Sequence, residues 1–408
     1  MLLAIVAVAA LLRIGWWWIA HPEPVSDYLG YRSIALRLFS DGEYSRFGEP
    51  TAWRTPGYPV FLAFSMTVSR SDRWLSVMNV ALSIGSVPLT WWFVRRLGLG
   101  TRVALAGAAG VAIMPTLVLW APVLGSENLQ VVLMLFAWSL SCGVSDRRGA
   151  IVAGVVFGVA VLVRPESVFF LLAVPWLVRI AVPEWRRVVR LAAVISVSAG
   201  VVIAPWYVRN ELVVGRGAGL STTGGFNFYL AHREDGYRYV EPEKTPLAGL
   251  DELELNRRGY ALAMDIIRSN PFGVVRSSLR SSYELYRTPT YAAFYSTRRQ
   301  TPSPHQPGVS ATVVRSAERA SVVGWVVTVA LIPMGVAALL AVRRSRRALS
   351  ALVALVVANW VCFAVVFWGM PRYRFAVDPV LAVVAAVGLH ALLSLHFGRR
   401  RRTRASMV

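Results

Sequence analysis

The chain has 408 residues, of which 56% are hydrophobic, and its formal net charge is +21. An ordinary water-soluble domain has about 45–50% apolar residues, so this composition excludes that class and indicates a membrane protein. In a soluble protein such a positive charge would suggest nucleic-acid binding. Here the arginines lie in short loops between apolar runs, where they report membrane topology, so no nucleic-acid partner is expected.

Apolar runs along the chain predict about ten transmembrane helices, because a span needs about 20 apolar residues and tolerates about 17. The runs cover residues 2–20, 73–94, 102–121, 126–144, 150–163, 167–182, 188–207, 320–342, 348–368 and 375–396. The run 150–163 would reach only about 21 Å at about 1.5 Å per residue. Residues 150–182 therefore form either two short tilted helices or a re-entrant hairpin. Trp18 stands where a signal-peptide cleavage site needs a small residue, so we expect the first run to remain as an anchor.

Arginines follow every second predicted span, which places both chain ends in the cytoplasm by the positive-inside rule. The protein then has an N-terminal transmembrane module, 1–207, whose first outer loop is 21–72. An outer region, 208–318, precedes C-terminal transmembrane helices, 319–398, and a basic cytoplasmic tail, 399–408. The turn 369–374 also faces outward. Cys142 and Cys362 both fall inside apolar runs and are expected to be buried.

Helical spacing of apolar residues in the outer segments predicts short helices outside the membrane. Residues 28–39 and 56–69 are too short to span and are expected to lie along the interface. Residues 252–268 and 271–286 are predicted helices of the outer region, whereas the proline-rich stretch 288–310 is a predicted loop.

The polar first outer loop contains an acid, Asp27, then Tyr31, Arg54 and the turn Pro56-Gly57-Tyr58-Pro59. Further motifs follow in the order Ser126-Glu127-Asn128, Leu162-Val-Arg-Pro165, Pro205-Trp-Tyr-Val-Arg-Asn210 with Ser221-Thr-Thr-Gly-Gly-Phe-Asn227, and Arg372-Tyr-Arg-Phe-Ala-Val-Asp-Pro379. Together they resemble the polyprenyl-phosphate-sugar-dependent glycosyltransferases of the GT-C superfamily, in the ArnT-like and protein-mannosyltransferase-like branch. The resemblance covers most of the chain.

This resemblance implies an all-α polytopic membrane protein with a GT-C-like helix bundle and interfacial helices in the first outer loop. It also implies a membrane glycosyltransferase that moves a monosaccharide, with inversion, from a polyprenyl-phosphate donor on the outer face of a bacterial cytoplasmic membrane. The implied acceptor is a lipid-linked glycan, a glycolipid or a protein hydroxyl. Two rival functions stay open: a transporter or lipid flippase, and a polymerase or ligase of lipid-linked glycans.

Such a transfer needs a carboxylate as general base and fixed cations for the leaving phosphate. By the resemblance, Asp27 and Glu127 are the candidate catalytic acids, although each could instead cap or complement a helix N-terminus. The candidate phosphate ligands are Arg54, Arg164, Arg372 and Arg374, because guanidinium groups pair with phosphate oxygens. Arg164 could instead pair structurally with Glu166, and Arg372 and Arg374 could extend toward lipid head groups.

The remaining candidates are substrate-binding residues and a metal site. The candidate substrate ligands are Tyr31, Arg32, Tyr58, Asn227 and Tyr373. Asp27, His21 and Glu23 could together hold a divalent cation, although their spacing matches no known metal motif. Arg13 lies within the first span and is expected to pair across the bundle.

Overall fold

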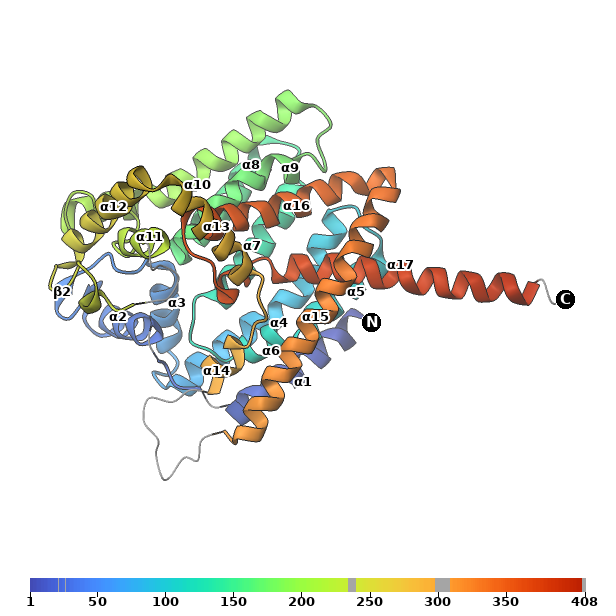
Figure 1. Ribbon diagram of the computed structural model, residues 1–408, viewed down its shortest axis with the longest axis horizontal. Helices are drawn as coiled ribbons and strands as arrows, with labels where there is room; N and C mark the ends of the chain where they lie inside the picture. The colour runs from blue at the N-terminus through green and yellow to red at the C-terminus, as the bar shows by residue number, and fades with distance from the viewer. Residues whose placement is uncertain (21, 26, 234–239, 298–308, 406–408) are drawn as a thin grey trace.

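The computed structural model describes residues 1–405 with the exception of 21, 26, 234–239 and 298–308. The described chain is helical apart from one small hairpin (Figure 1). Its first half contains α1 (Leu2–Ala20), α2 (Asp27–Asp41), β1 (Ser45–Arg46), β2 (Glu49–Pro50), α3 (Gly57–Met66), α4 (Asp72–Arg96), α5 (Thr101–Ile113), α6 (Pro115–Trp120), α7 (Glu127–Cys142), α8 (Arg147–Val163), the 3-10 helix η1 (Pro165–Ala173), α9 (Val174–Val178) and α10 (Trp185–Val213). Its second half contains α11 (Gly224–His232), η2 (Pro242–Lys244), α12 (Glu252–Ser269), α13 (Pro271–Leu285), α14 (Tyr291–Thr297), α15 (Ala311–Ala341), η3 (Arg343–Ser345), α16 (Arg346–Trp360), the π-helix η4 (Val361–Val366), η5 (Pro371–Arg374) and α17 (Asp378–Ala405).

The predicted multi-span architecture is confirmed. Within the described ranges, five helical segments are long and apolar enough to cross a membrane: α1, α4, α10, α15 and the stretch 343–366. The other predicted spans coincide with shorter or broken helices, namely α5 with α6, α7, α8, η1 with α9, and α17. The count of ten spans therefore stays a prediction. Over 150–182 the chain forms the helix α8, then the 3-10 helix η1 and the short helix α9, and the choice between two short spans and a re-entrant hairpin stays open.

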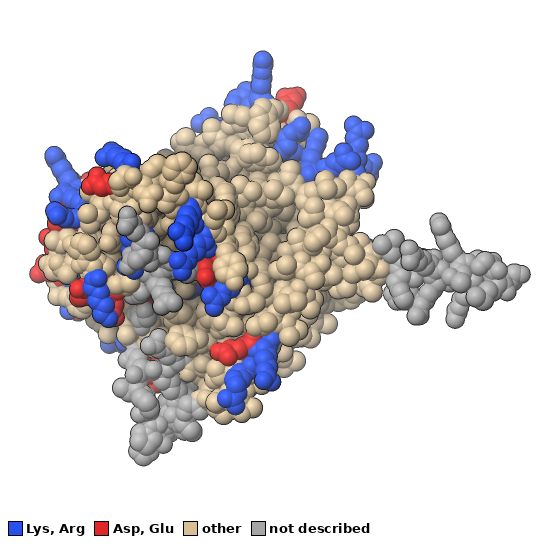
Figure 2. All heavy atoms as spheres, viewed as in Figure 1, with Lys and Arg blue, Asp and Glu red and all other residues tan. Residues whose placement is uncertain are grey.

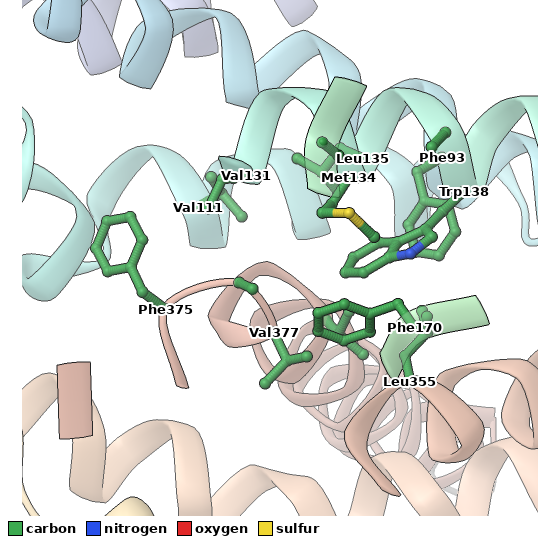
Figure 3. Close-up of a cluster of buried hydrophobic side chains, with 14 of the residues drawn as sticks. Phe93, Val111, Val131, Met134, Leu135, Trp138, Phe170, Leu355, Phe375 and Val377 are labelled. Carbon is green, nitrogen blue, oxygen red and sulfur yellow. The ribbon is translucent and has the colours of Figure 1, made fainter. Parts of the chain in front are cut away.

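The core is a continuous set of apolar side chains contributed by α4, α5, α7, η1, α16 and the start of α17. Figure 3 shows Trp138 of α7 beside Phe93 and Phe170, with Leu355 and Val377 facing them. Helices at the periphery of the bundle expose apolar side chains on the faces that point away from this core. Figure 2 shows the surface over the middle of α15 without charged side chains, and this is the surface that lipid would cover.

Small residues let the long helices approach closely. On α8, a Cβ atom added at Gly154 would lie 2.4 Å from the carbonyl oxygen of Ile195, and one at Gly158 would lie 2.6 Å from Val202. The Gly-x-x-x-Gly spacing thus forms the contact face of α8 against α10, as is common between membrane helices. Gly335 of α15 meets the backbone of α17 in the same way.

Arg13, buried within α1, donates hydrogen bonds to backbone carbonyl groups where α5 ends. Pro115 separates α5 from α6, so carbonyl groups at the end of α5 lose their helical donors. Arg13 donates to the carbonyl oxygens of Ala112 at 2.8 Å and Val111 at 2.9 Å, and also to the Ser83 hydroxyl at 2.9 Å. The predicted pairing across the bundle is confirmed, and its partners are backbone carbonyls and a hydroxyl.

The extramembrane elements gather at one end of the molecule, opposite the end of α17 (Figure 1). There α2 packs on α3, and α11 packs on α12. The predicted helices of the first loop and of 252–286 are confirmed, while the hairpin β1–β2 was not predicted. Its turn places Phe47 and Gly48 at φ values of 55° and 94°.

The predicted loop over 288–310 is wrong for Tyr291–Thr297, which form α14. Three of its residues are buried against α6 and α15, and Trp120 packs its ring 5.2 Å from that of Tyr291. Tertiary packing therefore stabilises a helix too short to form alone. The rest of that stretch, 298–308, lies outside the described residues.

Candidate active site

A pocket of about 510 Å³ is lined by residues of α2, η1, α11, α12, α14, η4 and η5 and of the loops next to them. Its charged floor consists of Asp27, Arg54, Arg164, Glu166 and Arg372. One wall is apolar and comes from η1, η4 and the turn after it, with Val168, Phe169, Phe363, Phe367, Trp368 and Met370. Another part of the lining is more polar and comes from residues 217–227 together with α12, including Ser221, Thr223, Asn227, Asn256 and Tyr260.

Asp27 is held between two arginines that are distant in sequence. Its Oδ1 accepts a hydrogen bond from Arg54 at 2.7 Å, and its Oδ2 accepts one from Arg372 at 3.2 Å. The Asp27 side chain remains 34% exposed, so it borders the open pocket. Of the candidate residues, Asp27, Arg54 and Arg372 thus meet at one cavity, which Arg374 does not line.

The two guanidinium groups determine the ionisation of Asp27. Burial on its own would raise the pKa of this carboxyl, but Arg54 and Arg372 outweigh burial and hold the pKa below its usual value. Burial acts to lower the pKa of Arg54, yet the Asp27 carboxylate keeps that pKa above its usual value. Asp27 is therefore a carboxylate at neutral pH and carries the charge that a general base needs.

A second carboxylate lies one layer below Asp27. Glu127, the first residue of α7, is only 2% exposed and is absent from the pocket lining. It pairs with Arg164 at 2.9 Å and with Arg372 at 3.3 Å. In this position Glu127 pairs with two arginines of the charged floor and does not itself border the pocket.

Both interpretations of Arg164 made from the sequence, a structural pair with Glu166 and a place in the site, agree with its position. It pairs with Glu166, as predicted, and donates to the Ser126 hydroxyl at 3.0 Å, while the same residue lines the pocket. The charged floor thus contains the guanidinium groups of three arginines, held in place by their acidic partners.

Two backbone contacts hold Arg54 and Arg164 close together at the charged floor. The Thr55 hydroxyl donates to the carbonyl oxygen of Val163 at 3.2 Å, which ties the residue after Arg54 to the residue before Arg164. At Gly57, an added Cβ would lie 2.8 Å from the carbonyl carbon of Leu162. Only glycine permits α3 to begin this close to the end of α8.

Three candidate substrate ligands line the pocket: Tyr31, Asn227 and Tyr373. Tyr373 stacks on Phe363, with ring centroids 4.7 Å apart and an interplanar angle of 10°. Burial, opposed by Arg372, raises the pKa of Tyr373 to about 12, so its hydroxyl remains protonated at neutral pH and can donate a hydrogen bond.

Arg374, the fourth candidate phosphate ligand, does not line the pocket with the other three. It is fully buried, pairs with Asp378 at 2.7 Å, and lies 3.5 Å from the centre of the Trp325 ring. The reason is the 3-10 helix η5, which has about three residues per turn. Residues two apart therefore point in different directions, and only Arg372 faces Asp27.

Arg32 and Tyr58 are also placed outside the pocket lining, contrary to prediction. Arg32 turns away along α2 and pairs with Asp72. The Tyr58 hydroxyl accepts a hydrogen bond from Asn79 at 2.8 Å, and its ring packs edge-on against Tyr31 at 5.1 Å. Tyr58 therefore supports a pocket residue and does not contact the cavity itself.

Several lining residues had no signal in the sequence analysis. They include Trp53, Asn256, Tyr260, Tyr295 and Trp368. Trp53 lies directly before Arg54 and could have been found from that position. Trp368 lies four residues before Arg372 and could have been found in the same way. Asn256, Tyr260 and Tyr295 come from segments without a candidate residue, and only the fold brings them to the pocket.

The predicted metal ligands are only partly described. Within the described ranges, no group of three or more His, Cys, Asp and Glu side chains lies close enough to hold a metal ion. His21 lies outside those ranges, so the set His21, Glu23 and Asp27 stays a prediction.

Comparison with known proteins supports the resemblance drawn from the motifs. Residues 53–208 match the family described as dolichyl-phosphate-mannose-protein mannosyltransferase. No curated protein sequence matches the chain.

Among solved structures, the chain is similar to the archaeal oligosaccharyltransferase AglB from Archaeoglobus fulgidus, solved in complex with an inhibitory peptide and a dolichol-phosphate. That match has a TM-score of 0.57 and 14% identity, and it covers 99% of this chain and 52% of AglB. The chain thus spans about half the length of that relative. ArnT from Cupriavidus metallidurans, bound to undecaprenyl phosphate, matches with a TM-score of 0.46 and 14% identity, over 95% of this chain and 77% of ArnT. The chain therefore shares its fold with AglB, in agreement with the GT-C-like helix bundle that the sequence motifs predict.

Proposed function

We propose that the chain is a membrane glycosyltransferase that transfers a monosaccharide from a polyprenyl-phosphate donor to a hydroxyl acceptor. The observation that carries this proposal is the Arg54–Asp27–Arg372 arrangement, in which one carboxylate and two guanidinium groups meet in an open pocket. A base and a phosphate ligand are the two groups that glycosyl transfer from a lipid phosphate requires. The match of residues 53–208 to the mannosyltransferase family supports the same class of reaction.

The two walls of the pocket suit the two ends of such a donor. The apolar wall, with Phe169, Phe363 and Phe367, can take the first isoprene units of the lipid. The polar wall, with Ser221 and Asn227, offers neutral hydroxyl and amide groups that can hydrogen-bond sugar hydroxyls. The phosphate of the donor would bind at the charged floor.

The proposed chemistry is a single displacement with inversion. Asp27 takes the proton of the acceptor hydroxyl while the acceptor oxygen bonds to the anomeric carbon. The bond from the anomeric carbon to the phosphate oxygen breaks, and the electron pair leaves on the polyprenyl phosphate. Arg54 and Arg372 stabilise the negative charge on that leaving group through charge-assisted hydrogen bonds.

Because these two arginines already bind Asp27, the donor phosphate has to compete with the carboxylate for them. Phosphate binding would therefore loosen Asp27 from its arginines. Loss of these cationic contacts raises the pKa of Asp27, which makes the carboxylate a stronger base at the moment when the donor is present.

The direct test uses the purified protein in liposomes with a radiolabelled polyprenyl-phosphate monosaccharide and a mixture of lipid-linked glycan, glycolipid and protein acceptors. The proposal expects the label to move to one acceptor and to stay on the donor when Asp27→Asn replaces the wild type. A chelator added to the wild type shows whether a divalent cation takes part.

Two outcomes would contradict the proposal. Movement of the labelled donor across the bilayer without transfer would indicate a flippase, and transfer only from oligosaccharide donors would indicate a glycan ligase or polymerase. We further propose that the pocket faces the outer side of a bacterial cytoplasmic membrane, since the arginine pattern places residues 21–72 and 208–318 there.

A further inference from the structure

Glu252, the first residue of α12, makes three short hydrogen bonds to two segments far from it in sequence. Its Oε2 accepts from the Thr51 hydroxyl at 2.6 Å. Its Oε1 accepts from the backbone N–H of Ala52 at 2.8 Å and from the Thr222 hydroxyl at 2.6 Å. Glu252 does not line the pocket, so it contacts the substrate site only through these neighbours.

The residues that Glu252 holds lead directly into the charged floor. Ala52 is followed by Trp53 and Arg54, both of which line the pocket. Residues 221 and 222 also bind this segment directly. The Thr222 N–H donates to the carbonyl oxygen of Ala52 at 3.0 Å, and the Ser221 hydroxyl donates to the carbonyl oxygen of Trp53 at 3.0 Å. One carboxylate thus fixes the segment before Arg54 and the polar wall of the pocket relative to each other.

The segment is held from its other side as well. Arg209 of α10 donates to the carbonyl oxygen of Thr51 at 2.7 Å, and Thr55 is tied to Val163. Arg54 therefore lies in a short stretch whose backbone is anchored before and after it. The Glu252 carboxylate accepts hydrogen bonds from residues 51 and 52 and from Thr222. Its removal would break these bonds and loosen the contact between the two segments.

We propose that Glu252 is a positioning residue that sets the place of Arg54 opposite Asp27 from the outer region of the chain. This inference rests on the proposed function, because it assigns Arg54 to the donor phosphate. It gives α12 a role in the transfer without any contact between α12 carboxylates and substrate. A misplacement of a reacting group by about 1 Å is enough to slow an enzyme by about 10²-fold.

The experiment is a double-mutant cycle with Glu252→Ala and Arg54→Ala, read as the dissociation constant for a polyprenyl phosphate without sugar and as the rate of sugar transfer. Positioning predicts that Glu252→Ala slows transfer about 10²-fold and weakens lipid-phosphate binding. In the Arg54→Ala background the same change is expected to have little further effect on binding, because residues that act through one another are not additive.

The conservative variant and a matched control separate positioning from general stability. Glu252→Gln keeps an oxygen that can accept from Ala52 and Thr222, so it is expected to restore most of the activity lost in Glu252→Ala. Asp265→Asn removes a carboxylate from the same helix, at a side chain that is 73% exposed, and is expected to behave as wild type.

Each possible result decides the inference. Glu252→Ala with wild-type transfer would overturn it, and so would losses that add to those of Arg54→Ala. If Glu252→Ala does not fold, a Glu252→Gln variant as inactive as Arg54→Ala would contradict the inference, and a largely active one would support it. If the wild type neither binds the lipid phosphate nor transfers sugar, the proposed function itself fails. That result differs from one in which the wild type is active and the losses of the two variants add.

Discussion

At the scale of the residue, the chemistry of the pocket depends on which anion occupies Arg54 and Arg372. In the structure it is the Asp27 carboxylate, at 2.7 Å and 3.2 Å. The proposed donor brings a phosphate to the same two groups. In the free protein, the proposed base, Asp27, therefore occupies the two arginines that the phosphate of the donor will need.

The first prediction concerns Asp27→Asn. Removal of the carboxylate charge leaves both arginines without their anionic partner, so the variant should bind a polyprenyl phosphate more tightly than wild type. Sugar transfer should fall by about 10²–10⁴-fold, the usual contribution of a general base. Binding is measured by titration in detergent and transfer with the labelled donor. Unchanged transfer would remove Asp27 from the mechanism, and weaker phosphate binding would contradict the competition.

The second prediction concerns pH. Arg54 and Arg372 overcome the effect of burial and lower the pKa of Asp27, so the base of the free enzyme stays ionised down to a pH below the usual aspartate value. Arg54→Ala removes one cation, the pKa of Asp27 rises, and the acid limb of kcat/KM moves to higher pH. The profile of the slow variant is measured against Arg32→Ala, whose arginine pairs with Asp72 outside the pocket and whose acid limb should not move. An acid limb at the same pH in Arg54→Ala would contradict the assignment.

The same shift affects stability. The pKa of Asp27 is lowered in the folded protein, so its ion pairs stabilise the fold above the unfolded-state pKa, and this contribution is lost as pH falls through the folded-state pKa.

The sequence could identify Asp27, Arg54 and Arg372 because each belongs to a motif at a membrane boundary. It could not separate Arg372 from Arg374, because both are arginines of one short turn and only the 3-10 geometry of η5 orients them. Glu252 had no sequence signal either. Its partners lie 200 and 201 residues away at Ala52 and Thr51, and a single acid at a helix start is usually a simple end effect.

At the scale of the element, periodicity and hydropathy predicted most helices, but not where they break. The run 103–121 is apolar apart from Thr116, yet Pro115 divides it into α5 and α6. Arg13 from another helix then donates to a carbonyl group at the end of α5. Helix α14 was missed for the opposite reason. Its seven residues carry little helical signal, and packing against Trp120 supplies the stability.

The third prediction tests a contact between elements. Gly57→Ala places a Cβ atom 2.7 Å from Val163 and 2.8 Å from the backbone of Leu162, so α3 and the end of α8 must separate. We expect a loss of stability of about 1–3 kcal/mol, the usual cost of overpacking, together with slower transfer because Arg54 and Arg164 flank this contact. Gly15→Ala in α1 is the matched control, since nothing lies within 4 Å of its added Cβ. Thermal unfolding in detergent measures both variants, and equal midpoints would contradict the close approach.

At the scale of the whole molecule, the helices α2, α11 and α12, which contribute residues to the pocket, lie together at one end of the helix bundle (Figure 1). This arrangement agrees with the arginine pattern of the loops, which assigns residues 21–72, 208–318 and 369–374 to one side of the membrane. Segments separated by more than 300 residues share a site because the bundle brings their loops to the same end. A lipid-linked donor and its acceptor would then have to meet on that side.

The fourth prediction follows from Lys244, the single lysine among 43 basic residues of the two types. Its side chain is 72% exposed and pairs at the surface with Glu241 at 3.5 Å, so an amine-reactive reagent can reach it. A membrane-impermeant reagent of this kind, added to intact cells or spheroplasts, should modify the peptide that contains Lys244. Lys244→Arg keeps the charge and removes the reactive amine, so the label on that peptide should disappear. Modification only after the cells are opened would place residues 208–318 in the cytoplasm, invert the topology, and exclude transfer on the outer face.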